Sequence, residues 1–418
     1  MNYVKMNYDL KNNDAYASLK INDFKWFVSA RFLLTFAIQM QSVIVGWQIY
    51  EITHDALSLG LIGLSEALPF LSISLFAGHV AEVVTRKKII LISNIVYLLS
   101  ASALFLISTR FHIILIEQGV FPIYLIIIVT GVARGFMSPA QGAFVAQLVP
   151  RELFGNASTW NSLAWQLADV TGPATGGLLY GFSGIGNAYL VVIIMSAAGF
   201  LLFAKVQNKQ LPARASKETI RQSLSAGLKF VFKEQIILSA ITLDMFAVFF
   251  GGAVSVLPIF ADQVLHIGAK GLGFLRAAPA LGEIIMSVIQ AHNPFFKNAG
   301  RNLLICVFAF GISMILFALS KSFYFSLFVL FLSGLFDNVS VIIRATIIQL
   351  YTPDEMRGRV SAVNGIFVGS SNELGSFESG LAAKLLGLVP SIIFGGSMTL
   401  IVVAVIQTFA PKLRKLKL

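Results

Sequence analysis

Long apolar runs constrain the fold of this chain more than any other feature of its sequence. Runs of about 20 residues alternate with short polar turns, only 12% of the 418 residues are charged, and the mean hydropathy is +0.80. A soluble domain of this composition would have too little polar surface to cover its core. A helix needs about 20 apolar residues to cross a bilayer core of roughly 30 Å, whereas a membrane barrel would show alternating polarity. We therefore expect an all-α polytopic membrane protein.

The second constraint is an internal repeat. The stretch 138–177 returns as 342–380, in each case an apolar run ending in Gln-Leu, a polar turn with Pro and Gly, and a second apolar run. An offset of 203 positions aligns Pro150 with Pro353, Glu152 with Glu355 and Gly177 with Gly380. An early hairpin repeats at an offset of about 210, which aligns Gly63 with Gly273 and Glu66 with Arg276. Such symmetry is typical of transporters built from two related bundles.

The runs divide the chain into two similar halves. Twelve transmembrane helices are expected, at 26–50, 57–80, 89–109, 121–148, 157–180 and 187–205, and again at 236–261, 271–291, 303–319, 323–349, 360–386 and 391–409. The domains are then a tail 1–25, a six-helix bundle 26–205, a linker 206–235, a second six-helix bundle 236–410 and a basic tail 411–418. In the linker, Ile220, Leu224, Leu228 and Val231 recur near helical spacing, which predicts an amphipathic helix on the membrane surface.

The positive charges indicate an orientation. The net charge is +11, yet only three Lys or Arg residues between the spans, Arg110, Lys270 and Lys321, fall on the side opposite the N-terminus. Cytoplasmic loops carry an excess of Lys and Arg, so both termini are expected in the cytoplasm. The same charges favour contact with anionic lipid and form no single patch for nucleic acid.

Two bundles joined by a cytoplasmic linker imply a central cavity that opens to alternate sides when one bundle rocks against the other. At this point the chain resembles the major facilitator superfamily, over essentially its whole length. Gly78, Glu82, Arg86 and Lys87 are similar to the family's loop motif between helices two and three, which holds cytoplasmic helix ends together when the cavity opens outward. Glu82 stands in place of the usual Asp and Thr85 in place of a usual glycine, which implies a weaker contact.

A second motif, Gly172, Pro173, Gly176 and Gly177, resembles the end of the fifth-helix motif of the superfamily's antiporters. Proline removes one helical donor and glycines let a neighbouring backbone approach, so the segment predicts a kinkable helix contact, or helix packing alone. The stretches 46–50, 138–177 and 352–380 together are similar to the enterobactin (siderophore) exporter branch of bacterial multidrug-type efflux proteins. That resemblance implies a monomer in the bacterial inner membrane that exports a siderophore or another amphipathic small molecule in exchange for protons.

Charged residues inside the spans are the candidates for coupling, because each costs about 2.5 to 3.5 kcal/mol at the centre of a membrane helix. They are Arg31, Glu66, Arg134, Asp169, Asp244, Arg276, Glu283, Asp337, Arg344, Glu373, Glu378 and Lys384. Arg31, Arg344 and Lys384 lie within reach of helix ends, where long side chains extend to the interface.

The deeper carboxylates are the preferred proton carriers: Glu66, Asp244, Asp337 and Glu378. Arg134 is their expected partner, since the superfamily's antiporters often carry an arginine in the fourth helix. A carboxylate that moves between a wet and a paired environment can load and release a proton. The alternative is that these residues form structural pairs that hold helices together.

Aromatic residues in the first and seventh spans are candidates for the cavity wall, namely Trp47, Tyr50, Phe249 and Phe250. They would stack on an aromatic ligand, although most aromatic residues in so Phe-rich a chain must pack or face lipid. Cys306 is the only cysteine, and no potential ligands cluster at metal-binding spacing, so we expect neither a metal site nor a cofactor.

The sequence thus predicts a secondary active transporter and no enzyme, because no nucleophile and base are grouped near one membrane face. The expected function is proton-coupled efflux of an amphipathic small molecule by alternating access. Uptake or lipid flipping on the same fold stays open as an alternative, as does a non-transporting receptor or scaffold. The expected partners are a small-molecule substrate, protons and membrane lipid, without nucleic acid.

Overall fold

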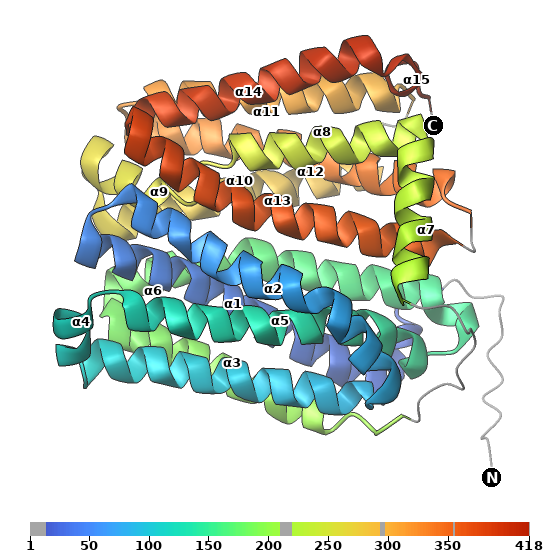
Figure 1. The fold of residues 1–418 in the computed structure, drawn as a ribbon, viewed down its shortest axis with the longest axis horizontal. Helices are drawn as coiled ribbons and strands as arrows, with labels where there is room; N and C mark the ends of the chain where they lie inside the picture. Colours follow the sequence, from blue (N-terminus) through green and yellow to red (C-terminus); the bar gives the residue numbers. More distant parts are fainter. Residues whose placement is uncertain (1–13, 210–219, 293–296, 354–355, 418) are drawn as a thin grey trace.

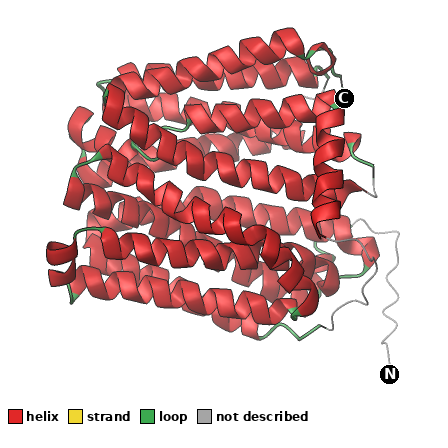
Figure 2. Ribbon diagram, in the orientation of Figure 1, coloured by secondary structure: helices red, strands yellow, loops and turns green. Residues whose placement is uncertain are grey.

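The computed structural model describes residues 14–209, 220–292, 297–353 and 356–417. For a few residues within helices, among them 78–79, 81–83 and 220–224, the description covers the backbone only. All regular structure in these residues is helical (Figure 2). The long helices are α1 (Asn22–Thr53), α2 (Ala56–Val83), α3 (Arg86–Thr109), α5 (Phe121–Leu148), α6 (Phe154–Ala204), α8 (Gln235–Gly251), α10 (Gly268–His292), α11 (Ala299–Leu319), α12 (Phe323–Tyr351), α13 (Arg357–Leu386) and α14 (Leu388–Phe409). The shorter elements are η1 (Ser18–Lys20), α4 (Ile113–Gln118), η2 (Arg151–Leu153), α7 (Ile220–Lys233), α9 (Leu257–Ile259), η3 (Phe260–Val264) and α15 (Pro411–Arg414).

The described residues form twelve helical spans once the local geometry of three helices is considered. Within the described residues, nine helices are long and apolar enough to cross a membrane by themselves, and α7 joined to α8 would supply a tenth. α6 contains two spans, because Gly184 has φ 80° and ψ 170° and breaks the helix. α13 falls outside this set because it is more polar, yet it packs alongside α2 and α8. Counting both parts of α6, α8 and α13, the predicted number of spans is confirmed.

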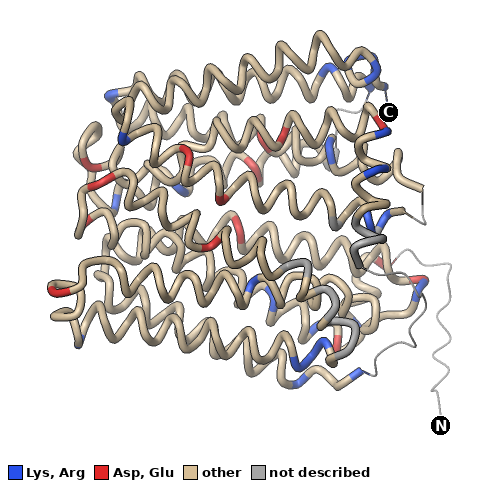
Figure 3. The backbone as a smooth tube through the Cα atoms, viewed as in Figure 1, with Lys and Arg blue, Asp and Glu red and all other residues tan. Residues whose placement is uncertain are grey.

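The long helices form two groups of nearly parallel helices, α1 to α6 in one and α8 to α14 in the other (Figure 1). In the first group α1 packs on α6 and α2 on α5, and in the second α10 packs on α12 and α11 on α14. We call the end where α1 begins and α14 finishes the terminal end, and the opposite end the distal end. Lys and Arg residues gather along the terminal end, around α7 and α15 (Figure 3).

The two groups meet through α2 with α13 and through α6 with α10. Glycines make both contacts close: a Cβ on Gly177 would lie 2.7 Å from Cα of Gly273, and a Cβ on Gly380 would lie 2.6 Å from Cα of Gly60. Any larger side chain at these positions would collide with backbone. Gly177 and Gly380 are equivalent in the sequence repeat, so the same repeat position makes a close contact at both interfaces.

The seventh span differs from its prediction. A single helix was expected over 236–261, but α8 ends at Gly251, and the short elements α9 and η3 follow. The prediction was wrong because Gly251 and Gly252 have low helix propensity, and Pro258 provides no backbone donor.

The linker helix α7 also differs in its environment. It meets α8 at an angle of 100°, and the described part of its apolar face packs on protein. Val231 is fully buried and clusters with Val360 and Val363 of α13. Of the residues that predicted this helix, Ile220 and Leu224 lie outside the described side chains. The division of the chain into domains at 1–25, 26–205, 206–235, 236–410 and 411–418 stays a prediction.

Candidate functional site

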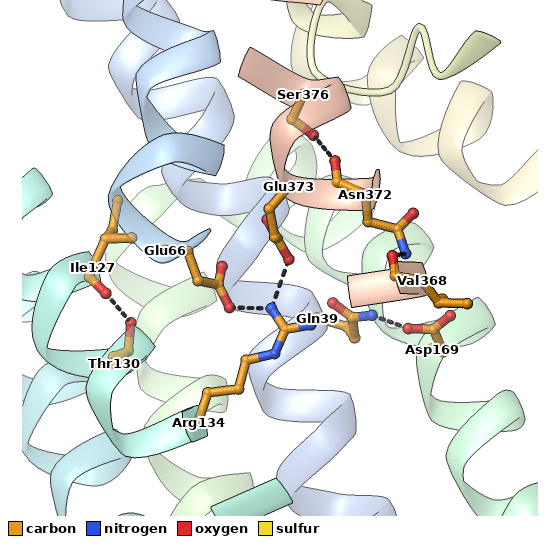
Figure 4. A network of polar contacts seen from close by, with 10 residues as sticks. All are labelled: Gln39, Glu66, Ile127, Thr130, Arg134, Asp169, Val368, Asn372, Glu373 and Ser376. Carbon is orange, nitrogen blue, oxygen red and sulfur yellow. Dashed lines mark hydrogen bonds and ion pairs between the residues drawn. The ribbon is translucent and has the colours of Figure 1, made fainter. Parts of the chain in front are cut away.

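Three charged side chains join the two halves in the middle of the molecule. The Arg134 guanidinium on α5 places Nη1 2.6 Å from Oε1 of Glu66 on α2 and 2.6 Å from Oε1 of Glu373 on α13 (Figure 4). The side chains of Glu66, Arg134 and Glu373 are 23%, 31% and 16% exposed. We call these three residues the central triad. Glu66 and Arg134 belong to the first half and Glu373 to the second, so the triad spans the interface.

Small residues one turn away bring the three helices together. A Cβ on Gly131 would lie 2.7 Å from the backbone oxygen of Glu66, so glycine there lets α5 approach α2. A Cβ on Gly63 would lie 2.8 Å from Cβ of Ser376, so glycine there lets α2 approach α13. The Arg134 guanidinium also lies 5.1 Å from the ring centre of Phe70, a cation–π distance.

The charge of the central triad depends on one proton. A single guanidinium faces two carboxylates, so the group is neutral only when one carboxylate is protonated. Breaking the Arg134–Glu373 pair would leave an unpaired carboxylate in a poorly solvated site, where the neutral form is favoured. Separation of the two halves at this point would therefore take Glu373 away from its positively charged partner.

A second polar contact lies beside the triad within the first half. Nε2 of Gln39 on α1 donates to Oδ1 of Asp169 on α6 (Figure 4). The sequence repeat aligns Asp169 with Asn372, whose amide instead donates to the backbone oxygen of Val368, 3.1 Å away in its own helix. The two halves are thus chemically different at this equivalent position.

The other predicted coupling residues do not join the triad. Asp244 on α8 forms an ion pair with Arg344 on α12, entirely within the second half. Arg344 was expected to reach the membrane interface, and this was wrong: it is 7% exposed, because its guanidinium turns inward to Asp244. Among the described residues, neither Asp337 nor Glu378 has a hydrogen-bond or ion-pair partner.

Arg31 and Lys384, the other two cations expected near helix ends, have different surroundings. Nη1 of Arg31 donates to Oδ1 of Asn161 on α6, 2.8 Å away, within the first half. Lys384 lies near the distal end of α13 and remains 56% exposed.

Two polar contacts close the distal end between the halves. Nζ of Lys384 lies 2.5 Å from Oδ1 of Asp55, and the Tyr50 hydroxyl donates to Oδ2 of Asp262, 2.7 Å away. We call these four residues the distal latch. Oδ2 of Asp55 also accepts from the backbone N–H of Ser58 at 2.9 Å and so caps α2. Burial acts to raise the pKa of the Asp55 carboxyl, but the hydrogen bonds from Lys384 and Ser58 outweigh it and lower the pKa.

The predicted aromatic wall is only partly assembled. Trp47 and Tyr50 are 5% and 1% exposed and lie in the packed core near the distal end. Trp47 donates to Glu51 at 2.5 Å, while Tyr50 belongs to the distal latch. The rings of Phe249 and Phe250 are half-buried and meet edge to face, 4.9 Å apart.

The two family motifs occupy different parts of the first half. Gly78 and Glu82 lie outside the described side chains. Arg86 donates to the backbone oxygen of Ala143 at 2.8 Å, and Lys87 donates to that of Ala204 at 2.9 Å, which ties the terminal end of α3 to α5 and α6.

In the second motif, Pro173 lies inside α6 and the three glycines contact different neighbours. A Cβ on Gly172 or on Gly176 would lie 2.7 Å from atoms of α1. Gly177 faces Gly273 of the other half. The motif therefore positions α6 against both halves.

Glu373 is the residue that sequence reasoning undervalued. It was among the charged residues within the spans but outside the preferred proton carriers. Arg134 is 239 positions away, so no local pattern links the two. The sequence signal that could have indicated this contact is the repeat. It relates α2 to α10 and α13 to α6, and α2 and α13 are the helices that meet at this interface.

Comparison with known proteins shows how far this architecture extends. The family described as transmembrane secretion effector, MFS_3, matches residues 13–417. The enterobactin exporter of Shigella flexneri is 25% identical over 336 residues, which cover 80% of this chain and 78% of that protein. The enterobactin exporter of Escherichia coli O1:K1 / APEC is 26% identical over 336 residues, covering 80% and 79%.

Solved structures share the fold at low sequence identity. A bacterial homologue of the human lysosomal transporter Spinster, in an inward-facing and unoccupied conformation, has a TM-score of 0.68 and 14% identity, covering 96% of this chain and 97% of that one. A D-xylose–proton symporter has a TM-score of 0.72 and 12% identity, covering 94% and 99%. The family match over nearly the whole length and the two-half helical fold show that this chain belongs to the transmembrane secretion effector family of major facilitator transporters, and is a multi-pass membrane transporter of a small molecule rather than an enzyme.

Proposed function

We propose that this protein exports an amphipathic small organic molecule across the bacterial inner membrane in exchange for protons, by alternating access. The central triad is the observation that carries the proposal. Arg134 and Glu373 sit on opposite halves and share a contact that must break if the halves separate at that point. A proton-sensitive group is thereby coupled to the motion that transport requires.

The distribution of contacts supports a conformation closed at the distal end. Contacts from α2 to the second half run from Asp55, paired with Lys384, through Gly60 and Glu66 to Phe70, whose ring lies 3.3 Å from a Cβ built on Gly369. All of these positions lie in or next to the distal half of α2. In this conformation the substrate would enter from the terminal end, which is the cytoplasmic end if the charge asymmetry sets the orientation.

The proposed cycle follows from which pair can form in each conformation. In the distally closed state the ion pair with Arg134 favours the charged form of Glu373. When the distal end opens with substrate, Glu373 leaves Arg134, stays in a poorly solvated site and takes up a proton that arrives from outside the cell. Closing returns Glu373 to the guanidinium, and the proton leaves toward the cytoplasm. Glu66 stays with Arg134 throughout, because both belong to the first half.

The substrate class is proposed from the relatives. The two exporters named above carry enterobactin in their names, and they align with 80% of this chain. A siderophore or a similar amphipathic compound is therefore the first ligand to test. The protein is proposed to act as a monomer with both termini in the cytoplasm.

The test uses everted membrane vesicles with an acidic interior and enterobactin as the probe. The wild type should accumulate the probe, and a protonophore should abolish the accumulation. Glu373→Gln should lose gradient-driven accumulation, whereas Glu117→Gln, the same chemical change at an exposed position on α4, should behave as the wild type. Accumulation that persists after collapse of the proton gradient would refute proton coupling, and gradient-driven loss of probe from the vesicles would indicate uptake.

A further inference from the structure

A separate cavity lies between η1, α1 and the first part of α6, near the terminal end. Its volume is about 650 Å³, and no residue of the central triad or the distal latch lines it. Its wall is apolar, with Phe32 and Leu33 of α1 facing Leu163 and Leu167 of α6. The lining also includes Lys20 and Lys25, both of which are exposed and lie toward the terminal end.

The terminal edge of this cavity is held in place by specific hydrogen bonds. Asn156 on α6 accepts from the backbone N–H of Ser18 at 3.1 Å and donates to the backbone oxygen of Ala15 at 2.8 Å. The indole N–H of Trp160 donates to the same oxygen at 2.8 Å, and its ring lies 5.5 Å from that of Tyr16. The segment that carries Lys20 is therefore fixed across α6.

The dimensions of the cavity match part of one membrane leaflet. Lys25 and Leu33 are eight residues apart on α1, which is about 12 Å along the helix. Half of the hydrocarbon core is about 15 Å thick. Leu163 and Leu167 are 40% and 39% exposed within this wall. A charged rim above an apolar slot of this depth has the polarity profile of a phospholipid.

The charges of the rim favour an anionic headgroup. Lys20 pairs with Asp14 at 2.5 Å, so Lys20, Lys25 and Asp14 together carry one net positive charge. That charge complements a monoanionic phosphodiester, whereas a zwitterionic headgroup has no net charge to offer. Basic pockets between membrane helices bind anionic headgroups in this way.

We propose that this cavity binds one anionic phospholipid, with its phosphate at Lys25 and Lys20 and an acyl chain along Phe32, Leu33 and Leu163. The lipid would fill the space between α1 and α6 and hold η1 against them. It is a bound component of the transporter and is distinct from the transported molecule.

The test is photo-labelling in phosphatidylcholine nanodiscs that contain a small fraction of phosphatidylglycerol with a diazirine on its acyl chain. Label should map to residues 25–33 and 160–167, and phosphatidylcholine with the same diazirine should label these residues less. Lys25→Gln should weaken labelling about fivefold, since one Lys near an anionic surface contributes about that factor. The matched control is Lys229→Gln with Lys233→Gln, two exposed lysines on α7 at the terminal end and outside the cavity.

A steric variant keeps the test independent of charge. Leu163→Trp should fill the slot and reduce labelling while both lysines remain. Variants are compared only if they elute as one species with an unchanged melting temperature. Equal labelling by the two lipids, or labelling unaffected by both Lys25→Gln and Leu163→Trp, would overturn the proposal. Displacement of the labelled lipid by inorganic phosphate would identify a site for free anions. Displacement by enterobactin but not by unlabelled phosphatidylglycerol would assign the cavity to the transport path. Either result would also overturn the proposal.

Discussion

The distal latch makes a quantitative prediction about the balance between the distally closed and distally open conformations. Asp55 and Lys384 belong to different halves, so their ion pair forms only in the closed conformation. Asp55→Asn removes the charge but keeps a good helix cap, and Lys384→Gln removes the other partner. Each change should therefore favour the open conformation without weakening α2.

The size of the effect follows from exposure. The Lys384 side chain is 56% exposed, so water screens the pair, and exposed ion pairs contribute about 0.2 to 1 kcal/mol. The ratio of open to closed molecules should then rise by about 1.4-fold to 5-fold. Asp55→Ala also removes the cap, which costs roughly 1 kcal/mol in both conformations. It should lower the melting temperature further while changing the open-to-closed ratio no more than Asp55→Asn does.

The assay is the distance between spin labels at Phe111→Cys and Leu385→Cys, introduced after Cys306→Ala. Both labelled positions are exposed at the distal end, 53% and 73%, on opposite halves. The long-distance fraction should increase in each single variant, and the double variant Asp55→Asn with Lys384→Gln should add little to either. Strictly additive effects of the two single changes, or no change in any variant, would refute the assignment of this pair as a latch.

The pH dependence of the latch has a definite sign. The pKa of Asp55 is lowered in the closed conformation, so the pair stabilises that conformation above the ordinary Asp value and is lost only as pH falls through the lowered pKa. Between about pH 5 and pH 8 the Asp55 carboxylate should therefore stay charged. Any pH-dependent opening in that range must arise from another group.

Two further predictions concern the packing between the halves and a buried ion pair. Gly380→Leu should favour distal opening and lower the free energy of unfolding by about 1 to 3 kcal/mol, because its Cβ would collide with Gly60. Gly365→Ala should be close to neutral, because no atom lies within 4 Å of its Cβ. Both variants are measured by melting temperature and by the distal spin-label distance. Asp244→Asn should destabilise the protein by about 3 kcal/mol, since it leaves the buried Arg344 without its charged partner. The measurement is thermal unfolding. An unchanged melting temperature would show that the pair is not formed.

The fold was largely predictable from the sequence because hydropathy and the repeat act over long stretches. Twelve spans and two related halves follow from apolar runs, since helices in lipid must satisfy their own backbone. Local exceptions were missed where a few residues decide the outcome. The end of α8 depends on the Gly251–Gly252 pair, whereas the more polar α13 was predicted correctly as a span at 360–386.

The candidate site was predictable as a set of residues but not as a set of contacts. Charge within a span identified Glu66, Arg134 and Asp244, yet only the three-dimensional arrangement assigns Arg134 to Glu373 and Asp244 to Arg344. Helix rotation decides which partner a charge meets, and one sequence does not fix that rotation. The pairing of Asp55 with Lys384 was missed for the same reason, because Lys384 was expected only to extend to the membrane interface.

The most direct test of the central claim is the response of the distal spin-label distance to pH in the absence of substrate. If Glu373 gains a proton when it leaves Arg134, the open conformation binds more protons than the closed one, and lowering the pH from 8 to 5 should increase the open fraction. Glu373→Gln should be open to the same extent at every pH in this range. An open fraction in the wild type that does not change with pH, or a pH response that survives in Glu373→Gln, would contradict the proposed coupling through the central triad.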